Sequence, residues 1–210
     1  MGRWILGLIA AAGLAAFTVP ATAQFNKGAP WGADPFAGVE VLSETRDVVH
    51  GDVVHYRYRL RMGDGPYDVV QLHRVVREDS KGRAQARVGG AFLLPGMPQF
   101  FETIFMPSSV SAAADPDHAF AIYLAQNGID VWGMDWGWDF VPGDTQDFGF
   151  MEGWGVAKDA EHVDKALSIA RRMRTLTGLG NGRLHLLGFS YGVYVGYAVA
   201  NEETQRPPGH

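Results

Sequence analysis

The chain has 210 residues, no cysteine and a formal net charge of −5 at pH 7. The lack of cysteine excludes disulfides, a thiol nucleophile and any metal held by cysteine. A mildly acidic chain without a basic cluster is not typical of nucleic-acid-binding proteins, so no nucleic-acid partner is expected. A chain of this length forms one domain at most.

The amino terminus has the pattern of a secretory signal. Residues 1–3 form a short, positively charged start, and residues 4–17 are apolar. Ala21-Thr22-Ala23 then provides the small residues that a signal peptidase recognises. We expect residues 1–23 to be removed before Gln24, which predicts a secreted or periplasmic protein. An uncleaved membrane anchor is the alternative. Its apolar core would be short and diluted by Ala and Gly, so no stable membrane span is expected after cleavage.

The next segments predict a leader followed by antiparallel strands. Residues 24–38, with two prolines among them, indicate an extended leader without a regular element. Strands are expected over 39–45, 53–61 and 67–76, separated by turns at 50–52 and 63–66. Tyr and Leu alternate with Arg between positions 56 and 61. This alternation indicates one buried face and one solvated face, and the charges are expected to lie on the solvated one.

From residue 88 onward the pattern alternates between strands and helices. Strands are expected over 88–94, 129–135 and 184–187, and helices over 111–127, over 156–177 and after Ser190. Such alternation predicts a parallel sheet with right-handed crossovers. Ligands of such sheets bind beyond the carboxyl ends of the strands. Gly96-Met97, Asp135-Trp136 and Ser190 fall at those ends, and this convergence favours an enzyme over a structural module.

Gly188-Phe189-Ser190-Tyr191-Gly192 follows a short apolar run and precedes an apolar segment of helical length. This is the sequence form of a nucleophile elbow, in which a serine sits on a strained turn between a strand and a helix. Side chains two residues before and after the serine would collide across the bend, and glycine removes that collision. These five residues alone are a weak signal in a chain with 27 glycines. The prediction of a nucleophile elbow therefore depends on the strand expected before them and the helix expected after them.

The loop over 136–154 is rich in aspartate and aromatic residues. Asp135, Asp139, Asp144 and Asp147 could suggest calcium, but their spacing fits no EF-hand, and a solvated loop is expected. The tryptophans at 132, 136, 138 and 154 could form a platform for a lipid or a sugar. Packing at the mouth of the site is the preferred interpretation.

These segments resemble the α/β-hydrolase superfamily, with the lipase-like branch suggested by three stretches. They are Asp64 to Arg74, Gly128 to Trp132, and Leu184 to Gly192. The resemblance implies a mostly parallel sheet with antiparallel amino-terminal strands. It also implies a small-molecule or lipid ester as substrate, with no cofactor and no metal.

The resemblance implies acyl transfer to Ser190 and then to water. It places Gly96-Met97 at the family's oxyanion loop, so that the backbone N–H groups of Met97 and Tyr191 would stabilise the oxyanion. Pro95 stands where the family usually has histidine. Because the donors are backbone amides, we expect this departure to alter the loop rather than abolish the oxyanion hole.

The family's acid and histidine follow the serine in the chain, and about twenty residues follow Ser190 here. Glu202, Glu203 and His210 lie there, and His210 is expected in a frayed tail. Of the earlier histidines, His185 is expected in the core and His162 in solvent. Residues 39–210 are therefore interpreted as the amino-terminal part of a hydrolase domain whose sheet is incomplete at its carboxyl-terminal end, with little or no turnover alone. The strand before Ser190 would then be an open, apolar edge.

Two other interpretations remain. The chain could be a non-catalytic exported binding or scaffold protein that keeps the elbow fold. Within enzymes, a thioesterase, a peptidase or an acyltransferase would use the same serine.

Overall fold

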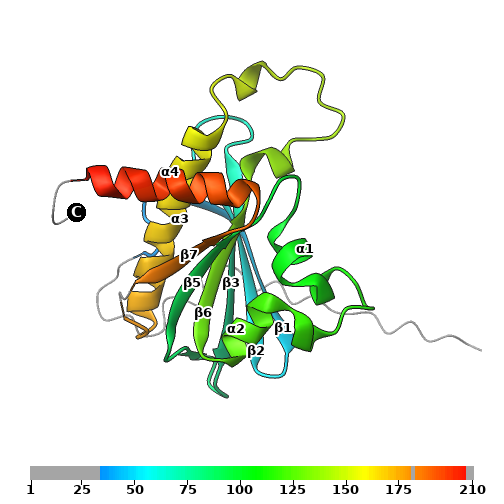
Figure 1. Ribbon diagram of the computed structural model, residues 1–210, viewed down its shortest axis with the longest axis vertical. Coiled ribbons are helices and arrows are strands. Elements are labelled where there is room, and N and C mark those ends of the chain that lie inside the picture. Colours follow the sequence, from blue (N-terminus) through cyan, green and yellow to red (C-terminus); the bar gives the residue numbers. More distant parts are fainter. Residues whose placement is uncertain (1–33, 181–182, 207–210) are drawn as a thin grey trace, which may run out of the picture.

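A computed structural model describes residues 34–180 and 183–206. Its centre is a seven-stranded sheet in the order β1-β2-β3-β6-β5-β7, with the short β4 paired to β3 (Figure 1). The expected signal segment and most of the expected leader lie outside the described residues. None of the helices in the described part of the chain is long and apolar enough to cross a membrane.

The first half of the sheet is antiparallel, as the sequence predicts. It consists of β1 (Glu40–His50), β2 (Val53–Arg61), β3 (Val69–Glu78) and β4 (Ala84–Gln85). Tyr58 and Leu60 of β2 are fully buried, while the arginines between and beside them are half-buried. Period-two alternation therefore places one face of β2 against the core.

The second half of the sheet is parallel. β5 (Gly89–Leu94) lies between β6 (Ile129–Asp135) and β7 (Leu184–Gly188) and runs parallel to both. β6 also pairs antiparallel with β3, and this pairing joins the two halves of the sheet. The predicted fold class, a parallel sheet extended by antiparallel amino-terminal strands, is confirmed.

Helices cover both faces of the sheet. α3 (Val156–Leu176) and α4 (Tyr191–Gln205) lie on one face (Figure 1), and their apolar side chains form one core with β2, β3, β5 and β6. α1 (Phe101–Phe105) and α2 (Phe120–Gln126) lie on the other face and form a second core. The sheet is thus the middle of three layers, which is how its apolar parallel strands are buried.

The predicted helix over 111–127 is wrong in its first half. Residues 111–115 form turns, the 3₁₀ helix η3 (Pro116–His118) follows, and α2 begins only at Phe120. Pro116 has no N–H to continue a helix, and the Asp115 carboxylate instead accepts the Asp117 N–H at 2.9 Å. No sequence pattern indicated α1 or the 3₁₀ helices η2 (Pro107–Ser109), η4 (Gly137–Phe140) and η5 (Gly149–Met151).

Both histidine expectations are wrong. His185 is exposed, because β7 is the last strand of the described sheet and its outer face carries no helix layer. Leu187, on the same face two residues later, is 41% exposed. His162 is 3% exposed, because the buried stripe of α3 is wide enough to include it with Asp159 and Ala166.

Some charges of the antiparallel half are also buried rather than solvated. Arg74 of β3 is fully enclosed and donates from Nε to Asp130 Oδ1 at 2.9 Å. Arg174 of α3 binds the other oxygen of the same carboxylate at 3.0 Å. Asp130 therefore joins β3, β6 and α3 through two buried ion pairs. The end of the expected leader also enters the core, since Phe36 packs against Tyr58 with ring centroids 5.1 Å apart.

Candidate active site

Ser190 lies on the turn between β7 and α4, where its backbone has φ 52° and ψ −117°. It is the only residue other than glycine with positive φ in the described part of the chain. Such a conformation costs on the order of 1–3 kcal/mol and persists only where the surroundings fix it. The Ser190 side chain is exposed at this turn.

The flanking glycines explain how the turn can close. A Cβ atom on Gly188 would lie 2.5 Å from the carbonyl oxygen of Gly192. A Cβ atom on Gly192 would lie 2.4 Å from the carbonyl oxygen of Leu94 in β5. Both distances are far below van der Waals contact, so each position requires glycine. Since the two glycines also face each other across the bend, the G-x-S-x-G spacing follows from steric contact.

The loop after β5 lies directly against Ser190. The Phe189 N–H donates to Leu94 O at 2.9 Å, which fixes the turn to the end of β5. A Cβ atom on Gly96 would lie 3.0 Å from Ser190 Cβ. The structure thus brings Gly96 and Ser190 into contact, with Met97 next in the chain and 53% exposed.

The amides of Met97 and Tyr191 are free to donate. Neither N–H has a hydrogen-bond partner among the described residues. Tyr191 opens α4, so its amide lies at the helix amino terminus, where N–H groups lack partners within the helix and the dipole favours negative charge.

The Tyr191 side chain points into the protein. Its hydroxyl donates to Asp159 Oδ2 at 2.7 Å, and its ring lies edge-on to Trp136 at 5.4 Å between centroids. Burial raises the pKa of Asp159, and the hydrogen bond from Tyr191 opposes that shift. Burial and the Asp159 carboxylate raise the pKa of Tyr191. These contacts tie the first turn of α4 to α3 and to the loop after β6.

The third loop, after β6, is more buried than the sequence suggested. Asp135 is 2% exposed rather than solvated, and Trp136 is fully buried, with Trp138 nearly parallel to it at 6.5 Å. Burial, with the nearby Asp135 carboxylate, raises the pKa of Asp139 to about 7. The Asp139 carboxylate also accepts the Trp136 N–H at 3.1 Å, which holds the loop. Asp144 and Asp147 are exposed, as expected.

No described histidine forms a hydrogen bond with Ser190. His55 is instead bonded to His73, and His73 is bonded to Asp135, within the sheet. This arrangement was not predictable from the sequence, because the two histidines lie on neighbouring strands and only the register of those strands brings them together.

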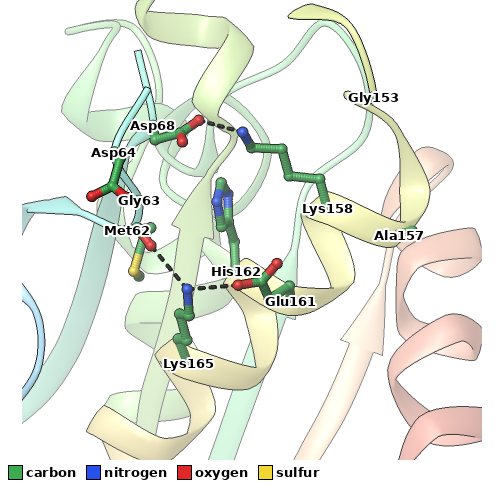
Figure 2. A pocket seen from close by; sticks show the side chains of 10 residues that line it. All are labelled: Met62, Gly63, Asp64, Asp68, Gly153, Ala157, Lys158, Glu161, His162 and Lys165. Atoms are coloured by element: carbon green, nitrogen blue, oxygen red, sulfur yellow. Dashed lines mark hydrogen bonds and ion pairs between the residues drawn. The ribbon is translucent and has the colours of Figure 1, made fainter. Parts of the chain in front are cut away.

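A separate hollow of about 520 Å³ lies between the β2–β3 turn and the start of α3 (Figure 2). The His162 ring lies between two ion pairs there, Asp68 with Lys158 and Glu161 with Lys165. Burial and Lys158 lower the pKa of His162 to about 4. Met97, Ser190 and Tyr191 do not line this hollow.

Comparison with known proteins defines the fold class. A candidate lipase from Sulfolobus solfataricus matches 78% of this chain with a TM-score of 0.57 and 21% sequence identity. A cold-adapted esterase from an Arctic intertidal metagenomic library and a candidate acetyl xylan esterase from Bacteroides fragilis match 76% and 77% of this chain. Their TM-scores are both 0.42, at 14% and 13% identity.

The chain therefore has the α/β-hydrolase fold, as the sequence resemblance implied. It spans about half the length of these solved structures, covering 46%, 59% and 44% of their chains. Neither a protein-family profile nor a curated protein matches the sequence.

Proposed function

We propose that the protein is an exported serine hydrolase that cleaves an ester bond through an acyl-enzyme on Ser190. The observation that carries this proposal is the backbone of Ser190. A non-glycine residue at φ 52° lies between two positions that only glycine can occupy, with Gly96 against it. Strain of this kind is retained where it serves a reacting group.

In this proposal the Ser190 hydroxyl attacks the ester carbonyl, and the N–H groups of Met97 and Tyr191 stabilise the oxyanion. Both amides lack hydrogen-bond partners among the described residues; Tyr191 directly follows the exposed serine, and Met97 directly follows Gly96, which contacts it. Loss of one such donor typically costs about 10²–10³ in kcat. The alcohol leaves, and water then releases the acyl group. Small-molecule or lipid esters are the proposed substrates, without a cofactor.

The reaction also needs a general base, and the proposal takes the acid and the histidine from a segment after α4 rather than from the described histidines. The exposed apolar side chains near Ser190 support this arrangement, because a following segment would cover them. They are Leu187, Phe189, Val193, Tyr194 and Tyr197. On this account residues 34–206 alone turn over slowly or not at all.

Export is proposed from residues 1–23, the apolar segment that ends in Ala-Thr-Ala. Mass spectrometry of the protein recovered outside the cytoplasm should find Gln24 as the first residue. Recovery of the protein in the membrane with Met1 retained would favour the anchor instead.

Hydrolysis of short-chain and long-chain p-nitrophenyl esters tests the activity. The assay uses the full-length protein, which here means the protein with the proposed segment after α4. The expected result is turnover that Ser190→Ala abolishes and that Ser111→Ala, at an exposed serine outside the site, leaves unchanged. A well-folded full-length protein without turnover on any ester would favour the non-catalytic binding protein. Faster product formation with an added alcohol or amine than with water would identify an acyltransferase.

A further inference from the structure

Four buried or half-buried side chains form a continuous chain across three strands and one helix. Asp135 Oδ2 of β6 lies 3.0 Å from His73 Nε2 of β3. His73 Nδ1 lies 2.9 Å from His55 Nε2 of β2. His55 Nδ1 in turn lies 3.5 Å from Oε1 of Glu102 in α1. His55, His73 and Asp135 are each at most 2% exposed.

The two ends of this chain meet on the same helix. Asp135 Oδ1 accepts the backbone N–H of Phe101, the first residue of α1, at 2.6 Å. Glu102, at the other end, is the second residue of α1 and also accepts from Arg57 Nη1 at 3.1 Å. The first turn of α1 is therefore held to β6 by the hydrogen bond from Phe101 to Asp135 and to β2 by the ion pair of Glu102 with Arg57, and the two bonded histidines lie between these contacts.

The hydrogen bonds have a defined direction. A carboxylate oxygen accepts, so with Asp135 as the acceptor His73 Nε2 donates, and His73 Nδ1 is then the acceptor that faces His55. His55 Nε2 then donates, which leaves His55 Nδ1 without a hydrogen and facing Glu102. Burial, then His73 and Arg57, lower the pKa of His55, which favours this neutral form. The 3.5 Å separation at the Glu102 end, the longest in the chain, fits two acceptors that face each other.

His55, His73 and Glu102 offer ligand atoms within 4.8 Å of one another, but the histidine geometry does not fit a shared metal ion. The two imidazole rings are nearly parallel, at 17°, with centroids 5.1 Å apart and their nitrogens at 2.9 Å. Two imidazole nitrogens on one tetrahedral zinc ion would lie roughly 3.3 Å apart with lone pairs converging on the ion. The observed nitrogens face each other directly, as in an N–H···N hydrogen bond.

Packing reinforces the position of Phe101. Its ring lies over His73 at 4.5 Å between centroids and 13° between planes. A Cβ atom on Gly133 of β6 would lie 2.4 Å from the same ring, so the ring occupies the space that a side chain would fill. Only residues 97–100 separate Phe101 from Gly96, which touches Ser190. A displacement of α1 would therefore reach the loop beside the serine.

We propose that Asp135, His73, His55 and Glu102 form a buried relay that fixes the first turn of α1 and thereby positions the Gly96–Met97 loop against Ser190. The four are positioning residues, because they act through α1 and do not touch the substrate. This inference rests on the proposed hydrolase function for its catalytic consequence. The placement of α1 is a structural consequence that can be measured without any activity.

The test compares His73→Leu with His73→Gln in the full-length protein. A glutamine at this position can still present a side-chain N–H to Asp135, whereas a leucine cannot. With a p-nitrophenyl ester, His73→Leu should lower kcat roughly 10- to 100-fold, since small misplacements of catalytic groups cost this much. KM should stay within about twofold. His73→Gln should recover most of kcat, and His162→Leu, at a buried histidine outside the relay, should leave it unchanged.

Glu102→Ala provides a second variant if His73→Leu fails to fold. It removes the ion pair with Arg57 at the far end of the relay, at a half-buried helix position, and it should lower kcat in the same direction by a smaller factor. Equal losses of kcat in His73→Gln and His73→Leu, or no loss in His73→Leu and Glu102→Ala, would overturn the proposal. So would added Zn²⁺ that raises the Tm of the wild type but not that of His73→Leu, because the residues would then be a metal site.

Hydrogen exchange of the backbone amides of residues 97–105 tests the relay separately from the proposed hydrolase function. The Phe101 amide should be protected in the wild type and in His73→Gln and should exchange at least tenfold faster in His73→Leu. This result would support the relay even if the wild type hydrolyses no ester, an outcome that defeats only the proposed function. Unchanged exchange in His73→Leu would defeat the relay even if Ser190 is reactive.

Discussion

Gly96 and Ser190 are so close that a Cβ atom on the glycine would lie 3.0 Å from Ser190 Cβ. The contact joins the loop after β5 to the turn after β7, although 93 residues separate them in the chain. Everything proposed for the site depends on this approach, because Met97, whose amide is the proposed oxyanion donor, directly follows Gly96 in the chain.

Gly96→Ala should damage catalysis more than stability. The new methyl group would press on Ser190 Cβ at 3.0 Å and on the Gln99 side chain at 3.1 Å, so the loop must shift by a few tenths of an ångström. We expect kcat for ester hydrolysis to fall about 10- to 100-fold. Gly143→Ala is the matched control. It lies in an exposed loop where a new Cβ atom would have no neighbouring atom within 4 Å, so kcat should not change. Equal kcat values in the two variants would show that the contact has no catalytic role.

Gly192→Ala and Gly196→Ala should have opposite effects on stability, although they lie one turn apart on α4. A methyl group at position 192 would lie 2.4 Å from the backbone oxygen of Leu94, which cannot move aside. We expect a loss of roughly 1–3 kcal/mol. At position 196 the nearest atom would be 3.6 Å away, so alanine should stabilise the helix by about 0.5–1 kcal/mol. Thermal unfolding of both variants checks the prediction, and a lower Tm for Gly196→Ala would contradict the described packing.

Asp130→Ala should be among the most destabilising single changes. It would leave the guanidinium groups of Arg74 and Arg174 buried without their shared carboxylate, and breaking a buried pair typically costs about 3–5 kcal/mol. Asp52→Ala removes an exposed ion pair with Arg77 and should cost no more than about 1 kcal/mol. Denaturant unfolding of the two variants provides the comparison. Similar losses would mean that the Asp130 pairs are accessible to water.

His162 should make stability depend on pH. Burial lowers its pKa to about 4 in the folded protein, against 6.5 for the unfolded chain. Between these values the unfolded chain binds more protons, so the wild type loses stability as pH falls from about 6.5 to about 4. His162→Gln removes this dependence. As pH falls from about 6.5 to about 4, the free energy of unfolding of the variant should therefore rise relative to that of the wild type by on the order of 3 kcal/mol. A difference in the free energy of unfolding that does not change with pH would contradict the burial of His162.

Elements with a strong local signal were predictable from the sequence. α3 was expected over 156–177 and spans Val156–Leu176, and β6 was expected at its observed bounds. The strand, turn and helix around Ser190 were also expected, because buried strands, a glycine-flanked serine and an apolar helix follow one another in the chain. The antiparallel pairing of β2 and β3 followed from their short turn.

Features that depend on distant parts of the chain were not predictable. The exposure of His185 depends on which strand ends the sheet, and the burial of His162 depends on how wide a face α3 presents to it. The relay of Asp135, His73, His55 and Glu102 requires the register of three strands and the existence of α1. α1 itself has only five residues, too few to show a helical period.

The most direct test of the central claim is covalent labelling of the full-length protein with a fluorophosphonate, followed by peptide mapping. The account predicts a single adduct on Ser190, absent from Ser190→Ala and slowed in Gly96→Ala, while Gly143→Ala reacts as fast as the wild type. An unlabelled Ser190 in folded full-length protein, or an adduct on another residue, would contradict the proposal that this turn presents a catalytic nucleophile.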